Sequence, residues 1–276
     1  HMADDNRTVS VDALTPAEIT EKVLSVARVK ANLPFARQLP LTFLAGVYIG
    51  LGAIFCALFQ GDATLSYSVQ KFMAGAVFSL GLSLVMTAGA ELYTGNTMMA
   101  AGAADGRISW GETVMNWVRV WVGNGLGAVA LALVVWLSHA AETGTAGVGL
   151  MTIAAGKMSA PWWTVFWKGV LCNLLVCLGV WMAYAGRSVA DRCVGVLLPV
   201  AAFVALGFEH CVANLFFLPM ALLLKASGFA PEGVNLEAIQ FSALWVNLSA
   251  ATLGNTVAGA GLALLYRQAY GKRAAK

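Results

Sequence analysis

The stretch Gly89-Ala-Glu-Leu-Tyr-Thr-Gly-Asn96 returns in outline later in the chain, as Gly207-Phe-Glu-His-Cys-Val-Ala-Asn214. Both copies keep the pattern Gly-x-Glu-x4-Asn, and each lies in the middle of a long apolar segment. A charged side chain inside a bilayer is costly, so an ionisable residue in such a segment is by default a candidate for a functional site. The two glutamates therefore bear on the fold and on the function together.

Composition places the chain among membrane proteins. Hydrophobic residues make up 59% of it and charged residues 11%, with a mean hydropathy of +0.74, whereas a soluble domain carries about 25% charged residues. The apolar runs cover roughly residues 41–60, 72–104, 113–138, 162–186, 193–224 and 238–266. Because a spanning helix needs about 20 residues, four runs suit one helix each. The second and fifth, at roughly 33 residues, are too long for one straight helix and too short for two.

Positive charge is distributed unevenly between the loops. Of the 17 Lys and Arg residues, 12 lie in the N-terminal segment, in the loops near 105–112 and 186–192, and in the C-terminal tail. By the positive-inside rule this side is cytoplasmic, so both termini lie there. We therefore predict an all-α membrane protein with six transmembrane helices, the second and fifth broken. An N-terminal cytoplasmic segment (1–40) precedes a transmembrane channel domain (41–268) and a cytoplasmic tail (269–276).

Three matches in the same order divide the membrane domain into two halves. The third spans share Asn-x6-Gly-Asn, at 116–124 and 247–255, the second spans share the Gly-x-Glu-x4-Asn elements, and the first spans share Phe-x2-Gly-Val, at 43–47 and 166–170. Since each half has an odd number of spans, the halves lie upside down relative to each other. Inverted repeats of this kind are typical of transporters, whose substrate paths lie at the repeat interface near the midplane.

An amphipathic helix is predicted at 15–31. Thr15-Pro16-Ala-Glu18 has proline at the first helical position and a glutamate in capping-box register, and Ile19, Val23 and Val26 follow at helical spacing. We predict that this helix lies along the cytoplasmic membrane interface; the alternative is a soluble cap that packs on the protein.

The two breaks are the predicted substrate path, because irregular backbone in a bilayer is tolerated only where it is buried or lines a cavity. A half-helix that starts just after a break presents free N–H groups and the positive end of its dipole, which attract an anion. His210 is the one histidine inside an apolar run, and histidine changes charge near neutral pH. We therefore predict that His210 relays protons at the second break.

The sequence offers one charge partner inside the same half. Lys168 is predicted to pair with Glu209, with Asn173 and Asn214 supplying hydrogen bonds, since a buried charge must pair or change its protonation state. The alternative is an ion pair that only fixes helix packing. No cluster of ligands accompanies His210, so we predict no metal and no cofactor.

Four apolar side chains on or next to the broken segments complete the predicted path: Phe78, Leu82, Leu92 and Phe203. They are either ordinary core residues or dry constrictions above and below His210. A bare anion is strongly opposed in a dry constriction, whereas a neutral weak acid passes easily. That contrast suggests attraction of an anion, proton transfer, and passage as the acid.

The strings GAELYTGNTM, KGVLCNLLVCLGVWMAYAGRS, GFEHCVAN and LGNTVAG resemble those of the formate/nitrite transporter family of bacterial inner membranes. The resemblance implies a homopentamer of aquaporin-like subunits, each with its own pore, a flexible loop in the second helix and a break in the fifth. By motif, His210 matches the family's central histidine and Thr94 its hydrogen-bonding threonine. The polar residues around that histidine correspond to Asn173 and Asn214, and the family's constrictions correspond to Phe78, Leu82, Leu92 and Phe203. The loop of its second helix corresponds to Glu91, Tyr93, Gly95 and Asn96.

We weigh three functions on this basis. The first is passage of small monovalent anions of weak acids through a lipid-embedded homopentamer, with formate as the first candidate substrate. Nitrite and hydrosulfide follow closely, because a lysine at position 168 is more similar to the nitrite and hydrosulfide branches of the family. The second is a neutral-solute pore for water, glycerol or ammonia, against which stands the absence of paired Asn-Pro-Ala motifs. The third, an intramembrane enzyme, lacks a convincing nucleophile–base pair, so we predict no enzyme and no nucleic-acid partner.

Overall fold

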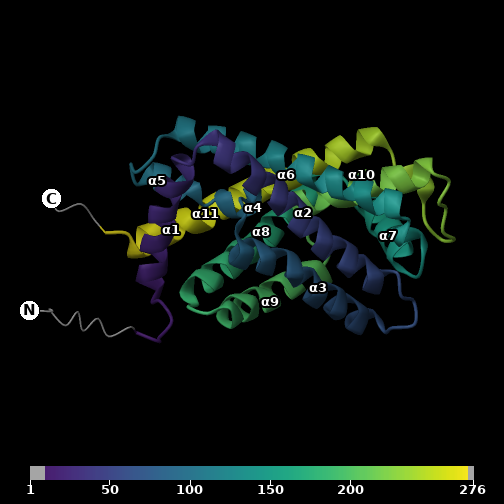
Figure 1. Cartoon of the computed structure of the whole chain (residues 1–276), viewed down its shortest axis with the longest axis horizontal. Helices are drawn as coiled ribbons and strands as arrows, with labels where there is room; N and C mark the ends of the chain where they lie inside the picture. The colour runs from purple at the N-terminus through teal and green to yellow at the C-terminus, as the bar shows by residue number, and fades with distance from the viewer. Residues whose placement is uncertain (1–9, 273–276) are drawn as a thin grey trace, which may run out of the picture.

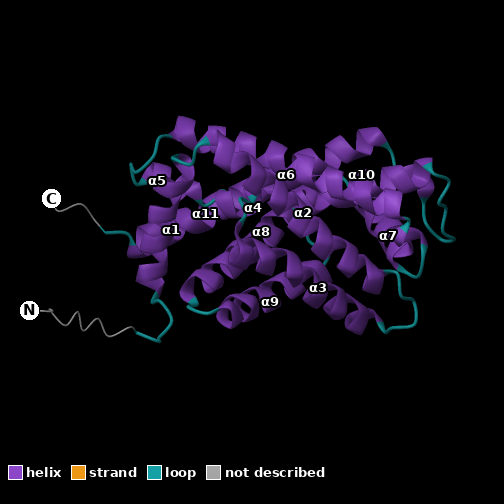
Figure 2. Ribbon diagram, viewed as in Figure 1, coloured by secondary structure: helices purple, strands orange, loops and turns teal. Residues whose placement is uncertain are grey.

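The structure is a computed structural model that describes residues 10–272, and in that part of the chain every regular element is a helix (Figure 2). Among the described residues, five helices are long and apolar enough to cross a membrane. They are α2 (Phe35–Gln60), α3 (Tyr67–Leu84) with the π turn that continues it, α6 (Trp110–Ser138), α8 (Trp162–Ala185) and α11 (Phe241–Tyr270).

The shorter helices lie between and before these. They are α1 (Pro16–Ala31), α4 (Tyr93–Asn96), α5 (Met99–Ala104), α7 (Ala146–Ser159), α9 (Val189–Ala205) and α10 (Cys211–Ala226), with the 3₁₀ turns Ala140–Glu142 and Leu236–Ala238. Helix α2 begins at Phe35, earlier than the predicted domain boundary at residue 41, because Pro34 starts it and the polar first turn is helical as well.

Both predicted breaks are confirmed. After α3 a π-helical turn runs over Val85–Gly89, and the chain is then extended until α4 begins at Tyr93. In the second half α9 ends at Ala205, and α10 begins at Cys211 after a short non-helical segment. Each break contains a glycine in the left-handed region, Gly89 at φ +93° and Gly207 at φ +71°, a conformation that costs other residues energy because of their Cβ atom.

Two pairs of long helices make close backbone contact at glycines. Helix α2 packs against α6, and α8 packs against α11. A Cβ on Gly127 would collide with the carbonyl of Phe43, and one on Gly254 with that of Phe166. The two phenylalanines are the ones that match between the halves, so each half builds its first and third helices into a pair with touching backbones.

Helix α1 packs on the protein through one face. Its predicted capping box is present: Thr15 accepts from the Glu18 N–H, and the Glu18 carboxylate accepts from the Thr15 N–H. The buried face of α1 is formed by Ile19, Thr20, Val23, Leu24 and Ala27. Helices α1 and α7 lie at opposite ends of the molecule (Figure 1), and α3 packs against α9.

Candidate transport path

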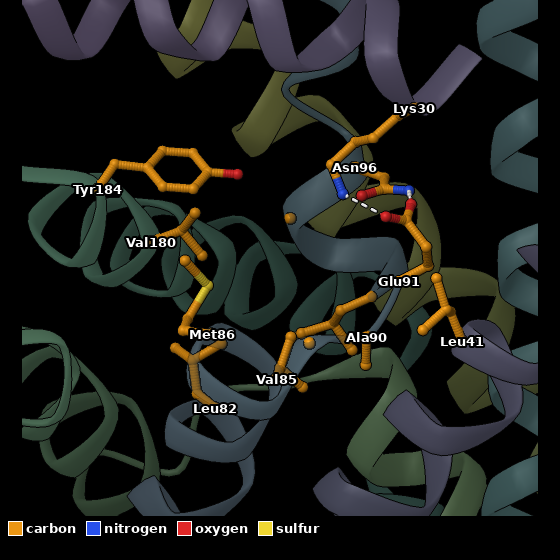
Figure 3. Close-up of a pocket in the computed structure, with 13 residues that line it drawn as sticks. Lys30, Leu41, Leu82, Val85, Met86, Ala90, Glu91, Asn96, Val180 and Tyr184 are labelled. Carbon is orange, nitrogen blue, oxygen red and sulfur yellow. Dashed lines mark hydrogen bonds and ion pairs between the residues drawn. The ribbon is translucent and has the colours of Figure 1, made fainter. Parts of the chain in front are cut away.

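Glu91, at the first break, is held by a lysine and an asparagine. Lys30 Nζ, from α1, lies 2.9 Å from Glu91 Oε1. Asn96 Nδ2 donates to Glu91 Oε2 at 2.8 Å and to Asn116 Oδ1 at 3.0 Å. Burial lowers the pKa of Lys30, but the negative charge of Glu91 and its hydrogen bond outweigh that effect, so the net shift is upward and the lysine stays charged. Figure 3 shows the three side chains at one edge of a cavity.

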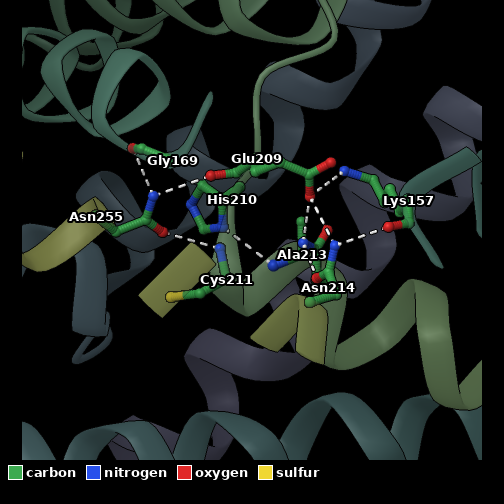
Figure 4. Close-up of polar contacts among 9 residues, drawn as sticks. Lys157, Gly169, Glu209, His210, Cys211, Ala213, Asn214 and Asn255 are labelled. Carbon is green, nitrogen blue, oxygen red and sulfur yellow. Dashed lines mark hydrogen bonds and ion pairs between the residues drawn. The ribbon is translucent and has the colours of Figure 1, made fainter. Parts of the chain in front are cut away.

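Glu209, at the second break, is held in the same way. Lys157 Nζ, from α7, lies 3.0 Å from Glu209 Oε2. Asn214 Nδ2 donates to that oxygen at 2.6 Å and to Asn247 Oδ1 at 2.8 Å (Figure 4). The duplication seen in the sequence therefore extends to a buried Lys–Glu–Asn–Asn network in each half.

The predicted pairing of Lys168 with Glu209 is wrong. Lys168 contributes its backbone carbonyl, which accepts from the Glu209 N–H at 3.2 Å, and the residue lines a cavity together with Lys157, Glu209 and His210. The physical reason is helix α7, which packs against α2 and α10 and brings Lys157 onto the break. Lys157 lies between the apolar runs 113–138 and 162–186, where the sequence assigns it no partner.

A signal for both missed lysines was present in the sequence. The segments Lys30-Ala-Asn-Leu-Pro34 and Lys157-Met-Ser-Ala-Pro161 share the spacing Lys-x3-Pro, and each proline precedes the first long helix of its half. The repeat therefore has four parts in each half, a short helix that ends in this motif followed by a long, a broken and a long helix.

The second asparagine of each Asn-x6-Gly-Asn motif, Asn124 or Asn255, forms hydrogen bonds to backbone groups on both sides of a break. Asn124 Nδ2 donates to the carbonyls of Thr42 and Glu91, both at 2.8 Å, and its Oδ1 accepts from the Tyr93 N–H at 2.9 Å. Asn255 repeats this arrangement with the carbonyls of Gly169 and Glu209, at 2.8 and 2.9 Å, and the Cys211 N–H, at 2.9 Å (Figure 4). A break leaves backbone groups without helical partners, and these two side chains supply the partners that water cannot.

The half-helix after the second break has fewer free N–H groups than the sequence predicts. The Cys211 N–H donates to Asn255, the Ala213 N–H to His210 Nδ1 at 3.0 Å, and the Asn214 N–H to the His210 carbonyl at 2.9 Å. Three of the N–H groups at the start of this half-helix are therefore already engaged inside the protein.

His210 lies at the second break with both ring nitrogens engaged. Because Nδ1 accepts from the Ala213 N–H, the neutral ring carries its proton on Nε2. Nε2 faces Thr94 Oγ1 at 3.4 Å. Phe203 stacks on the imidazole with centroids 5.7 Å apart, and Phe78 meets Phe203 edge-to-face at 5.6 Å. His210 and Thr94, far apart in sequence, are thus brought together among aromatic rings.

Two cavities approach this region from opposite sides. One, of about 280 Å³, contains Lys30 and Glu91 and is lined by Leu82, Leu92, Gly95 and Asn96 (Figure 3). The other, of about 370 Å³, is lined by Phe78, Phe203, Glu209 and His210. The four predicted constriction residues are all buried; the two phenylalanines face the cavity with His210, and the two leucines face the other.

The remaining predicted residues support the path rather than line it. Asn173 lies away from Glu209 and donates to the carbonyls of Thr94 and Asn255, at 3.2 and 2.6 Å, so it fixes the loop that presents Thr94. Tyr93 turns away from the cavities, and its hydroxyl lies 2.6 Å from Thr256 Oγ1. Between residues 10 and 272 no group of three or more His, Cys, Asp or Glu side chains is arranged to hold a metal ion.

Comparison with known proteins agrees with this arrangement. The family model described as formate/nitrite transporter matches residues 17–268. The chain belongs to the formate/nitrite transporter family.

Two curated members of the formate/nitrite transporter family show how far the similarity extends. The formate channel FocA of Haemophilus influenzae is 36% identical over 276 aligned residues, which cover 94% of this chain and 95% of FocA. The nitrite transporter NirC of Escherichia coli is 34% identical and covers 85% of this chain and 83% of its own length. A solved structure described as a pentameric formate channel with formate bound superposes with a TM-score of 0.75 at 35% identity, covering 91% of this chain and 99% of that one.

Proposed function

We propose that this chain forms a homopentameric channel of the bacterial inner membrane, with one pore per subunit, for small monovalent anions of weak acids. Formate is the first candidate substrate, followed by nitrite and hydrosulfide. The observation that carries the proposal is the pair of lysine-bearing cavities on either side of a buried barrier, in which His210 Nε2 and Thr94 Oγ1 lie 3.4 Å apart. The pentamer and the formate and nitrite substrates rest on the relatives.

The charges of the two cavities support an anion rather than a neutral solute. The cavity on the α7 side is lined by Lys71, Lys157, Lys168 and Glu209, which is a formal charge of +2 from three lysines and one glutamate. The cavity on the α1 side contains Lys30 and Glu91, whose charges cancel. A concave surface with an excess of positive charge raises the local concentration of anions.

The barrier between the cavities supports passage as a neutral acid. Phe78, Leu82, Leu92 and Phe203 are all at most 3% exposed, and moving an unpaired anion into such surroundings costs far more than moving the uncharged acid. An anion that enters from the positively charged cavity must therefore gain a proton before it crosses. His210 is the titratable side chain placed at that point.

We assign the proton relay to Nε2 of His210. A relay through histidine requires the imidazolium, in which both nitrogens carry protons. Charging the ring removes the hydrogen bond that Nδ1 accepts from Ala213, so the ring becomes charged only while an anion lies beside it and stabilises the positive charge. Transfer of the Nε2 proton to the anion gives the neutral acid and a neutral ring whose remaining proton is on Nδ1. Release of that proton to water and uptake of one from water by Nε2 restore the resting tautomer, in which Nδ1 again accepts from Ala213. Thr94 Oγ1 orients Nε2.

The proposed topology has six crossings in two inverted halves. The second crossing combines α3, its π turn, α4 and α5, and the fifth combines α9 and α10. Support comes from the duplicated networks and from α1 and α7, which bring their lysines from opposite ends of the molecule (Figure 1). The cytoplasmic placement of both termini, and the domain limits 1–40, 41–268 and 269–276 with α2 extended to Phe35, rest on the charge distribution.

Uptake into proteoliposomes tests the substrate class. Formate, nitrite, hydrosulfide and glycerol are compared side by side at two pH values. The proposal predicts fast uptake of one or more of the weak acids, rising as the pH falls. Fast glycerol uptake without acid uptake would instead establish the neutral-solute pore.

A further inference from the structure

A third cavity, of about 270 Å³, lies where the C-terminal end of α1 meets the first turns of α2 and α6. It is separate from the two cavities of the proposed path, and its polar lining comes from Gln38, Glu112, Asn116 and Arg119. Its volume is below the roughly 300–1,000 Å³ that is common for sites of drug-sized ligands. A small polar group fits a cavity of this size.

Two buried polar atoms of this cavity are unpaired. Gln38 is 3% exposed and Asn116 is 4% exposed. Within residues 10–272, Gln38 Oε1 and Asn116 Nδ2 have no hydrogen-bond partner. Because buried polar groups are almost always hydrogen-bonded, an unpaired acceptor and an unpaired donor in one cavity indicate a ligand that carries both kinds of group.

In the second half of the repeat, the equivalent asparagine donor has a partner inside the chain. Asn247, the counterpart of Asn116, donates from Nδ2 to the Lys157 carbonyl at 3.3 Å. In the first half the counterpart of that carbonyl, the carbonyl of Lys30, accepts from the Leu33 N–H instead. The donor of Asn116 is therefore left for a molecule outside the chain.

The two charged side chains of the cavity lie at different positions along α6. Glu112 lies in the first turn, and Arg119 lies seven residues further, about 10 Å along the helix. In the described part of the chain no carboxylate lies within ion-pair distance of Arg119, and its guanidinium lies 5.4 Å from the ring centroid of Phe35. Glu112 accepts from the Ser109 N–H. Since α6 enters the membrane from this end, the negative group is nearer to water and the positive group is deeper.

We propose that this cavity binds the headgroup of a phospholipid with a primary amine, a phosphatidylethanolamine, from the leaflet on the α1 side. In such a lipid the ammonium lies outside the phosphate, and the acyl chains lie deeper than both. The phosphate oxygens accept from Arg119 and from Asn116 Nδ2, and the ammonium donates to Glu112 and to Gln38 Oε1. The acyl chains continue along the exposed apolar residues Val122 and Leu126 of α6.

A lipid in this cavity contacts the network of the first break directly. Asn116 Oδ1 accepts from Asn96 Nδ2, and the same amide group holds the Glu91 carboxylate. Fixing the Asn116 amide therefore fixes the orientation of Asn96. The inference rests on the membrane placement of the helices and not on which anion is transported.

Native mass spectrometry of the detergent-purified oligomer tests the proposal. Phosphatidylethanolamine, phosphatidylcholine and phosphatidylglycerol with identical acyl chains are added in turn. The wild-type protein is expected to retain phosphatidylethanolamine, because phosphatidylcholine has no N–H donor and phosphatidylglycerol has no ammonium. Arg119→Ala is expected to weaken this retention about tenfold, the effect of losing a hydrogen bond to a charged group.

Two further variants make the result specific. Arg37→Ala removes the same charge from an exposed residue near the same end of α2, outside the cavity, and is expected to retain the lipid as the wild type does. Glu112→Gln keeps a residue suited to the capping box and removes the carboxylate, so the preference for phosphatidylethanolamine over phosphatidylcholine is expected to disappear.

Equal retention by Arg119→Ala and Arg37→Ala would overturn the proposal. So would a wild-type protein that retains none of the three lipids, the result expected if a neighbouring subunit covers the cavity. Should Arg119→Ala fail to assemble, the wild-type comparison of the three lipids and the Glu112→Gln variant still decide the question. No transport is measured, so a different substrate for the pore leaves the outcome unaffected.

Discussion

Replacing Lys157 by methionine is expected to destabilise the protein strongly, because it leaves Glu209 as an unpaired buried charge. The Glu209 side chain is 4% exposed, and its Oε2 lies 3.0 Å from Lys157 Nζ. Removing one partner of a buried ion pair costs about 3–5 kcal/mol. With roughly 2–4 °C of melting temperature per kcal/mol for a chain of this size, Lys157→Met is expected to lower the melting temperature by about 6–20 °C.

The matched control is Lys168→Met. Lys168 lines the same cavity, and no carboxylate of residues 10–272 lies within ion-pair distance of its side chain. Its replacement is expected to change the melting temperature by less than about 2 °C, as a substitution away from buried pairs and core packing does. The double variant Lys157→Met with Glu209→Gln removes both charges and is expected to recover most of the lost stability.

Thermal unfolding of the detergent-purified oligomer, followed by loss of the oligomer peak in size-exclusion chromatography, measures all three variants. A large loss in Lys168→Met with little effect of Lys157→Met would restore the pairing predicted from the sequence and refute the one observed. Equal, small losses in both would show that Glu209 is protonated or solvated, and the argument from buried charge would fail.

Two further predictions concern the breaks and the docking of α1. Asn255→Ala leaves the Gly169 and Glu209 carbonyls and the Cys211 N–H without their partner, so the yield of folded oligomer is expected to fall several-fold, whereas Asn235→Ala, at an exposed site, leaves it unchanged. The hydrogen bond from Arg107 lowers the pKa of Glu21 below its ordinary value of 4.5. The stability that this pair adds is therefore complete above pH 4.5, the ordinary pKa of the carboxyl group, and is lost as the pH falls through the lower pKa that Glu21 has in the folded protein. The protection factors of the α1 amides, which correct exchange for its intrinsic pH dependence, are expected to fall as the pH drops below 4.5, and Arg107→Gln removes this dependence.

The breaks were predictable because they need residues that a straight membrane helix disfavours. Gly89 and Gly207 adopt positive φ, and a buried Glu91 or Glu209 requires partners, so each position has an unusual residue that the sequence displays. The π turn at Val85–Gly89 has no such marker, because its residues suit an ordinary helix.

The ion pairs were not predictable in the same way. Lys168 and Lys157 both precede Glu209 in the same half, and choosing between them depends on where α7 packs, which hydrophobic pattern does not determine. Asn124 and Asn255 were found as a matched pair, but their role required the positions of three backbone groups on two other helices. The family resemblance supplied the roles of His210 and Thr94, and the structure adds their proximity and the neutral tautomer.

Formate uptake by His210→Phe proteoliposomes, compared with the wild type at an acidic and a neutral pH, tests the central claim most directly. Phenylalanine fills a similar volume among Phe78 and Phe203 but cannot carry a proton. The account predicts that the increase of wild-type uptake at acidic pH is lost in the variant while the oligomer remains assembled. Uptake with unchanged rate and pH dependence would contradict the proton relay through His210.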